Sequence, residues 1–175
     1  MRKLLVAAFV ALLASITVLV SPASAAPLDI TCVGTTSTSY SPPLTLDSRA
    51  TLVTETTILS PCVSATTPAI NAGVSVKTTN ENLSCLSLGG GGFNSQTISW
   101  SNVTTSNFGY NSTVTTLLGS RVVTKIGVIG SGTFATDTAV LVLTSPALNL
   151  LDCTPLGGGI SVATGTATLE ITSVM

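Results

Sequence analysis

The sequence predicts an all-β protein: a single-domain antiparallel β barrel or β sandwich of about nine strands with two disulfides. Threonine and serine make up about a third of residues 26–175, while the helix-forming residues Lys, Glu, Gln, Arg and Met are scarce. Several stretches alternate with the period of two that a sheet face requires. In residues 73–78, for example, the valines share one face and the serine and lysine share the other.

Strands are expected wherever these β-forming stretches run between turn signals. Clusters of Gly, Pro, Asn and Ser, such as residues 41–43, 89–92, 107–109 and 155–159, mark the ends of the strands. No helical period separates the stretches and no change of composition marks a linker, so one antiparallel domain is expected. The predicted strands lie near residues 29–37, 43–58, 72–79, 83–88, 96–104, 112–118, 120–129, 133–145 and 160–172.

Residues 1–25 have the three regions of a secretory signal peptide. Arg2 and Lys3 precede an apolar run over residues 4–20, and residues 21–25 end in the small-x-small pattern that precedes cleavage between Ala25 and Ala26. A retained membrane anchor is the alternative, because the apolar run reaches the lower end of the bilayer-spanning range. Pro22 directly after the run favours cleavage. We expect residues 26–175 to be secreted and extracellular, with no integral membrane segment after cleavage.

Export changes the charge balance of the protein. Without residues 1–25 the chain keeps four basic and seven acidic residues, a net charge of −3. The basic residues, Arg49, Lys77, Arg121 and Lys125, are scattered along the sequence. Nucleic acids and anionic membrane surfaces need clustered basic residues, so neither is an expected partner.

Four cysteines, Cys32, Cys62, Cys85 and Cys153, fall in the exported part. An even count in an oxidising compartment predicts two disulfides. In an alternating meander of nine strands, Cys62 and Cys153 follow the second and eighth strands at the same end, and the other two lie within strands. This count favours the pairs Cys32–Cys85 and Cys62–Cys153. No CxxC spacing and no histidine support a metal site, and no cofactor is expected.

The chain contains no histidine, which excludes Ser-His-Asp and Cys-His catalysis and HExxH metalloprotease sites. A pair of carboxylates could still act in a glycosidase or an aspartic protease. None of the seven acidic residues lies in a catalytic motif, so no catalytic residue is assigned. The seven are Asp29, Asp47, Glu55, Glu81, Asp137, Asp152 and Glu170.

Three aromatic residues are weak candidates for a ligand-binding site. Trp100, Phe108 and Tyr110 could form a platform on which a sugar ring stacks. The alternative for Trp100 is a core anchor, because it alternates with Ile98 along a predicted strand. The glycine runs lack the residues of a phosphate-binding loop and are interpreted as turns or bulges.

Several turn and strand patterns together resemble those of an uncharacterised family of small secreted actinobacterial β-rich proteins. They are the exported leader, the early Cys32, Ser41-Pro-Pro-Leu-Thr-Leu46, Ile98-Ser-Trp100, Gly130-Ser-Gly-Thr-Phe134 with Asp137, Cys153-Thr-Pro-Leu-Gly157 and Thr164-Gly-Thr-Ala-Thr-Leu169. The resemblance covers most of the exported chain and implies an extracellular β domain. It implies no activity, ligand or catalytic residue.

Three classes of function remain open from the sequence. The favoured one is a non-catalytic module that binds a ligand or associates with the cell envelope, with an envelope glycan or a small apolar molecule as partner. The second is a secreted carboxylate hydrolase acting on glycans. The third is a self-assembling surface protein, since apolar, threonine-rich and weakly charged strands can pair between molecules.

Overall fold

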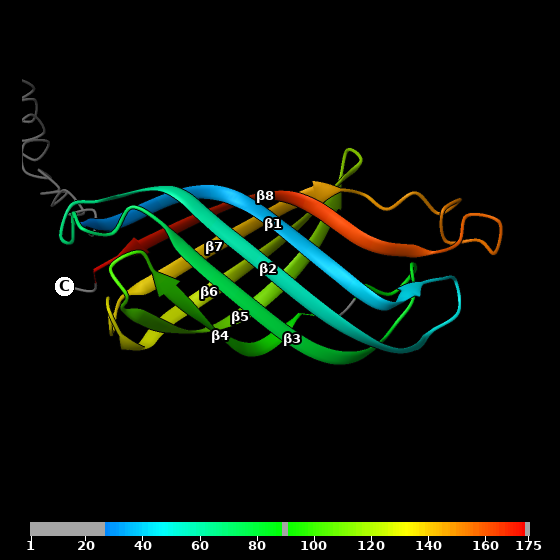
Figure 1. Cartoon of the computed structure of the whole chain (residues 1–175), viewed down its shortest axis with the longest axis horizontal. Helices are drawn as coiled ribbons and strands as arrows, with labels where there is room; N and C mark the ends of the chain where they lie inside the picture. The colour runs from blue at the N-terminus through cyan, green and yellow to red at the C-terminus, as the bar shows by residue number, and fades with distance from the viewer. Residues whose placement is uncertain (1–26, 89–90, 174–175) are drawn as a thin grey trace, which may run out of the picture.

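The protein is a closed antiparallel β barrel in the computed structural model, which describes residues 27–88 and 91–173. The predicted signal peptide and its cleavage site at Ala25 and Ala26 lie outside these residues. The described residues form eight strands and no helix (Figure 1). The strands are β1 (Leu28–Leu44), β2 (Arg49–Ser64), β3 (Gly73–Leu83), β4 (Gly92–Trp100), β5 (Thr105–Leu117), β6 (Ser120–Gly132), β7 (Thr138–Pro146) and β8 (Ile160–Thr172).

Each strand pairs with the next along the chain, and β8 returns to pair with β1, which closes the barrel. The all-β prediction is confirmed, and of the two expected architectures the protein adopts the barrel. Residues 83–88 do not form the strand predicted there, the fourth of the nine. Instead, Ser84 accepts backbone hydrogen bonds from Ser87 and, through its hydroxyl, from Leu86, so this segment folds into a local turn.

The predicted turn at residues 107–109 is also absent, because these residues lie inside β5. Gly109 has no side chain and so leaves room for an aromatic ring of the neighbouring strand. The ring of Phe93 on the neighbouring β4 lies over it, 3.7 Å from where a Cβ would be. Gly34 has a similar role on β1, since a Cβ there would lie 1.9 Å from the carbonyl oxygen of Ile58.

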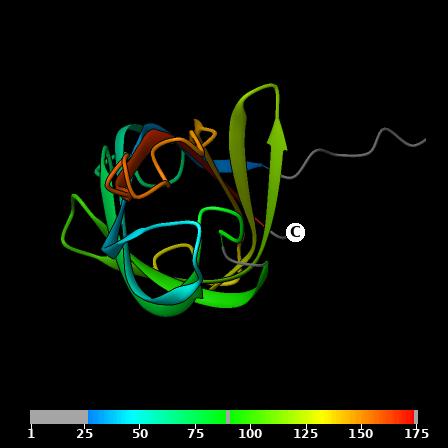
Figure 2. The same cartoon turned by 90° about the vertical axis from the view of Figure 1, so that its right-hand side faces the viewer.

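The two ends of the barrel differ. At the end that holds both termini of the described chain, the lumen is filled by an apolar plug around Trp100, Phe108 and Leu169. At the other end, which we call the mouth, a smaller apolar group around Tyr40, Leu44 and Leu83 lies beneath the connecting loops. Figure 2 looks into the mouth and shows the connections β1–β2, β3–β4 and β7–β8 around its rim.

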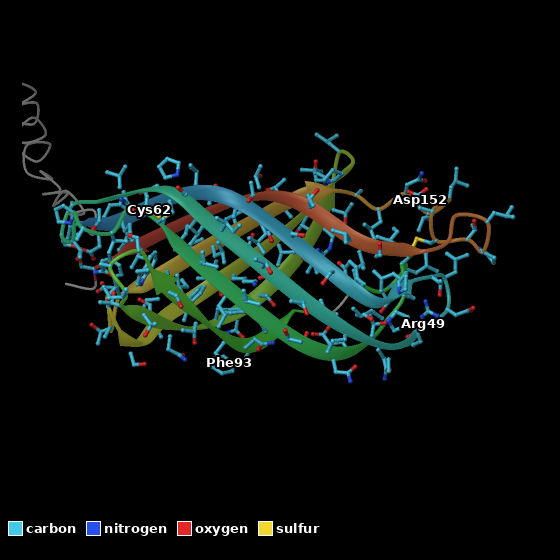
Figure 3. All side chains as sticks on the ribbon, viewed as in Figure 1. Arg49, Cys62, Phe93 and Asp152 are labelled. Atoms are coloured by element: carbon cyan, nitrogen blue, oxygen red, sulfur yellow. A yellow bond between two sulfur atoms is a disulfide. The ribbon has the colours of Figure 1, made fainter. Side chains whose placement is uncertain are left out.

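The protein contains two disulfides, as predicted, but the predicted pairing of the cysteines is wrong. Cys32 bonds to Cys62, and Cys85 bonds to Cys153. The loss of the predicted strand at 83–88 removes one strand from the count, so the loop with Cys153 lies at the opposite end from Cys62. Cys62 itself lies inside β2, directly opposite Cys32 on β1. In Figure 3, Cys62 lies at the plugged end, and Arg49 and Asp152 lie at the mouth.

In part of the barrel wall, apolar side chains face outward and polar side chains face the lumen. In β3 the valines predicted to share a face do so, but that face is the outer one: Val74 is 41% exposed and Val76 is 59% exposed. Ser75 and Lys77 point into the barrel. The middle of the lumen is therefore polar, although its plugged end is apolar.

Candidate functional site

A cavity of about 140 Å³ lies inside the barrel between the plug and the mouth. Side chains from all eight described strands line it, together with Leu88 from the β3–β4 connection. The exposed side chains of Glu81 and Asn94 also line it, so the cavity communicates with solvent. The site is thus an interior chamber with an opening.

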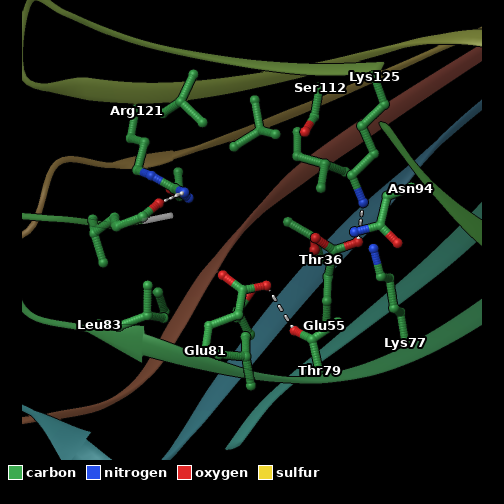
Figure 4. Close-up of a pocket in the computed structure, with 18 of the residues that line it drawn as sticks. Thr36, Glu55, Lys77, Thr79, Glu81, Leu83, Asn94, Ser112, Arg121 and Lys125 are labelled. Atoms are coloured by element: carbon green, nitrogen blue, oxygen red, sulfur yellow. Dashed lines mark hydrogen bonds and ion pairs between the residues drawn. The ribbon is translucent and has the colours of Figure 1, made fainter. Parts of the chain in front are cut away.

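Charged residues converge on this cavity. Lys77, Arg121 and Lys125, three of the four basic residues in 26–175, line it together with Glu55 and Glu81. Three positive and two negative side chains give the chamber an excess of positive charge, although residues 26–175 carry a net charge of −3. Figure 4 shows Lys77 and Lys125 at one side of the cavity and Arg121 at the other.

Lys125 is the most deeply buried of these cations, at 3% exposure. Its ammonium group donates hydrogen bonds to Glu55 Oε1 at 2.5 Å and to Gln96 Oε1 at 2.9 Å. It also lies 5.0 Å from the centre of the Tyr110 ring, within the range of a cation–π contact. The charge of Lys125 is therefore already satisfied by the protein.

Lys77 has weaker compensation. Its ammonium group donates to the hydroxyl of Tyr110 at 2.8 Å and lies 5.2 Å from the centre of that ring. Burial lowers the pKa of Lys77, and the positive charge of Lys125 lowers it further, whereas Glu55 and Glu81 raise it. A lysine in this position gains from the approach of an anion.

Tyr110, held between the two lysines, remains a neutral phenol. Burial raises its pKa, and the negative charges of Glu55 and Glu81 raise it further. Tyr40, closer to the mouth, behaves in the same way: burial raises its pKa, and Arg121 partly offsets that effect. Both hydroxyl groups can donate to a ligand in the chamber.

Arg121 is incompletely paired. One terminal nitrogen donates to the carbonyl oxygen of Leu88 at 3.2 Å, but the buried Nε atom has no hydrogen-bond partner among the described residues. The side-chain nitrogen of Gln96 is likewise buried without a partner there. Unpaired buried donors are costly, and a ligand with acceptor oxygens could satisfy that of Arg121, which lines the cavity, whereas Gln96 does not line it.

The rest of the cavity wall mixes hydroxyl-bearing and apolar side chains. Val53, Val114, Val123 and Leu143 face the charged groups from four different strands. These four side chains can contact a hydrocarbon group while the basic groups bind a polar head. This arrangement suits an amphipathic molecule.

The aromatic residues predicted as a surface platform are inside the barrel. Trp100 and Phe108 belong to the apolar plug, and Tyr110 alone of the three lines the cavity. The indole N–H of Trp100 donates to the Ser106 hydroxyl at 2.8 Å, and the ring meets Phe134 edge to face. These contacts give Trp100 the position of a core anchor.

The structure brings together two of the seven candidate carboxylates, Glu55 and Glu81, at the cavity. Glu55 is bound by Lys125, and Glu81 accepts a hydrogen bond from the Thr79 hydroxyl at 3.0 Å. No cluster of three or more potential metal ligands is found in residues 27–88 and 91–173. Nor does that part of the chain contain a helix long and apolar enough to cross a membrane.

The sequence interpretation missed the convergence of the basic residues because they are far apart along the chain. A signal was nevertheless present. Lys77, Arg121 and Lys125 lie within β-forming stretches rather than in loops, where a nearly uncharged chain would be expected to place its few charges. Charges within strands, each alternating with apolar or small neighbours, indicate a polar lumen.

No protein-family model, no curated protein and no solved structure matches this chain.

Proposed function

We propose that the protein is a secreted, non-catalytic binding protein that holds a small organic anion inside its barrel. The observation that carries the proposal is the convergence of Lys77, Arg121 and Lys125 on one partly apolar cavity. Electrostatic attraction is stronger in such a site than in water, because the surrounding protein has a low effective dielectric constant. Two disulfides are compatible with an extracellular location and support secretion.

The size and lining of the cavity define the class of ligand. Its 140 Å³ are close to the roughly 150 Å³ of a protein cavity that admits a benzene ring. A carboxylate on a ring or short hydrocarbon body could place its oxygens beside Arg121 and its body against Val53 and Val123, with the charge of Lys77 attracting it from the other side of the cavity. The geometry favours a small ligand over an envelope glycan, and it adds an anionic group to the apolar ligand expected from the sequence.

The chemical class can be tested with three ligands of nearly equal size. We expect benzoate to bind the purified protein in a calorimetric titration and benzamide to bind about tenfold more weakly, a difference of about 1.4 kcal/mol. Benzylamine should not bind, because its ammonium group would face the positive side chains. Equal affinities for the three, or a preference for the amine, would contradict the proposal.

Association between copies is a second candidate function, and the outer wall carries the observation that favours it. Two charged residues of the described strands are exposed and do not line the cavity, Arg49 and Glu170. Arg49 lies at the mouth, so Glu170 is the one that remains on the outer wall. The wall also exposes Phe93, at 78%, together with Ile126 and Val128. Figure 3 shows Phe93 pointing away from the barrel. A neutral wall offers little like-charge repulsion between neighbouring molecules.

Sedimentation velocity tests the second candidate. Assemblies of the wild-type protein should grow with concentration and dissociate in the Phe93→Lys variant. Val162→Lys, on the exposed outer face of β8, is the matched control. A monodisperse monomer at high concentration would exclude association and leave the binding proposal intact.

A further inference from the structure

Residues 26–175 contain two lysines, Lys77 and Lys125, and both lie beside the same aromatic ring. Their ammonium groups are 5.2 Å and 5.0 Å from the centre of the Tyr110 ring. Lys125 is neutralised by the Glu55 carboxylate. Within residues 27–88 and 91–173, Lys77 forms no ion pair, and its hydrogen-bond partner is the Tyr110 hydroxyl. The two amines therefore have different chemistry: one is a fixed cation and the other has no counter-ion.

The surroundings of Lys77 are those of a nucleophilic lysine. A lysine amine becomes a nucleophile when it loses its proton, and both desolvation and a neighbouring cation favour that loss. Lys77 is half-buried in the cavity wall, and Lys125 lies at the other side of the same ring. Burial lowers the pKa of Lys77 most, Lys125 lowers it further, and Glu55 and Glu81 only partly offset these effects. At a given pH, Lys77 thus has a free electron pair more often than an ordinary lysine does.

The barrel wall beside Lys77 gives small molecules access to the amine. The β3–β4 ladder consists of two residue pairs and ends at Val74, so Lys77 lies beyond its end. Every other neighbouring pair of the described strands is joined over seven or more residue pairs. Glu81 on β3 and Asn94 on β4 are exposed to solvent and also line the cavity. The cavity is therefore open to solvent next to the strand that carries Lys77.

The opposite side of the cavity carries an anchor for a carboxylate. Arg121 lies across the cavity from Lys77 and has a buried Nε atom without a hydrogen-bond partner among the described residues (Figure 4). Lysine amines condense with carbonyl compounds to form Schiff bases. A molecule with a carboxylate at one end and an aldehyde at the other would match both sides of the cavity.

We propose that Lys77 forms a Schiff base with an aldehyde whose carboxylate is held by Arg121, an inference that rests on the proposed anion site. The electron pair of the neutral Nζ attacks the carbonyl carbon, a C–N bond forms, and the π electrons of the C=O bond move to the oxygen. The Tyr110 hydroxyl, 2.8 Å from Nζ, is placed to donate a hydrogen bond to that oxygen. One proton passes from nitrogen to oxygen. The hydroxyl group and the second proton on nitrogen then leave as water, and the C=N bond forms without any oxidant or reductant.

Reductive trapping tests the proposal on the wild-type protein. The probe is 4-formylbenzoate, and cyanoborohydride supplies the hydride that converts an imine into a stable secondary amine. Mass spectrometry of the digested protein then locates the label. We expect Lys77 to be labelled at least about tenfold faster than Lys125, because Lys125 is held as a cation by Glu55. Lys77→Arg, with its fold checked by circular dichroism, should lose this adduct, while labelling of the α-amino group stays the same and serves as the internal reference.

A matched probe tests the anchor. The amide 4-formylbenzamide has nearly the same size but no negative charge, so it should label Lys77 about tenfold more slowly than 4-formylbenzoate. Arg121→Gln should slow labelling by the carboxylate and leave labelling by the amide unchanged. Equal labelling of the two lysines, or equal rates for the two probes in the wild type, would overturn the proposal.

The covalent step and the anion site can be separated experimentally. Benzoate has no aldehyde, so its calorimetric titration reports anion binding alone. Benzoate binding without an adduct at Lys77 would overturn the Schiff base and leave the anion site intact. An adduct at Lys77 without benzoate binding would overturn the anion site and, with it, the role of Arg121 as the anchor.

Discussion

The ammonium group of Lys125 on β6 lies 2.5 Å from the carboxylate of Glu55 on β2, across the lumen of the barrel. The two residues are 70 positions apart in the sequence. Their side chains are 4% and 20% exposed, so the ion pair is largely shielded from solvent. It joins opposite walls of the barrel at the level where the β3–β4 ladder is absent.

Breaking this ion pair from one side should destabilise the protein. Lys125→Met leaves the Glu55 carboxylate in a partly desolvated position without its cation, and we expect a loss of about 3 kcal/mol in the free energy of unfolding. The double variant with Glu55→Leu should lose less than the sum of the two single variants, because no uncompensated charge remains. Urea unfolding of the four proteins measures this coupling, and additive losses would show that the pair is energetically unimportant.

The two disulfides should contribute similarly to stability but differently to binding. Their sequence separations of 30 and 68 correspond to about 4 kcal/mol each by the chain-entropy estimate. Replacing Cys85 and Cys153 by serine also frees the connection that carries Leu88 and so should weaken carboxylate binding. Replacing Cys32 and Cys62, at the plugged end, should not. Equal binding in both variants would show that the mouth does not shape the cavity.

Ligand affinity should depend on the protonation of Lys77. Its pKa is lowered, so benzoate affinity should fall as the pH rises toward 10, before an ordinary lysine would lose its proton. Lys77→Arg should flatten this dependence, because a guanidinium stays charged. Titrations at several pH values provide the measurement. An unchanged pH profile in the variant would remove Lys77 from the site.

The same lowered pKa has a consequence for stability. Between the folded-state pKa of Lys77 and about 10.5, the unfolded chain binds more protons than the folded chain. The contribution of Lys77 to the free energy of unfolding is unfavourable below this window and becomes less unfavourable as the pH rises through it. The raised pKa of Tyr110 acts in the opposite direction above about 10. Unfolding experiments on Lys77→Met between pH 8 and 10, a range set about the usual lysine value, should therefore show a weaker rise of stability with pH than the wild type.

Trp100 should matter for stability and not for binding. Trp100→Phe removes the hydrogen bond to Ser106 and part of the contact with Phe134, and we expect a loss of about 2 kcal/mol. Benzoate affinity should be unchanged because the indole lies in the plug. A large loss of affinity in a folded variant would place the plug within the binding site.

Local sequence patterns were sufficient for most of the strands. Eight of the nine predicted segments overlap the eight observed strands, because threonine and valine alternation reports strand formation directly. The remaining segment, at 83–88, has a strand-like sequence, but Ser84 accepts hydrogen bonds from the nearby amides and forms a turn. That one error reversed the assigned end of Cys153 and produced the wrong disulfide pairing.

The candidate site could not be predicted in the same way. Alternation in β3 showed that Lys77 and the valines face opposite sides, but it could not show that the lysine side faces inward. That assignment depends on the tertiary structure: the pairing of β2 with β3 places Glu55 beside Lys77, and the closure of the barrel brings Lys125 within reach from β6. Three of the four basic residues in 26–175 line the cavity, so the few charges of this chain mark its interior site.

The central claim is that the cations in the lumen bind an anion. Its most direct test compares benzoate affinity in Arg121→Gln with that in Arg49→Gln, which removes the fourth cation, exposed at the mouth and bonded to the carbonyl oxygen of Pro43. Both variants lose one positive charge, so they differ in whether that charge lines the cavity. We predict at least tenfold weaker binding for Arg121→Gln and an unchanged affinity for Arg49→Gln. Equal effects, or no effect of Arg121→Gln, would contradict an anion site inside the barrel.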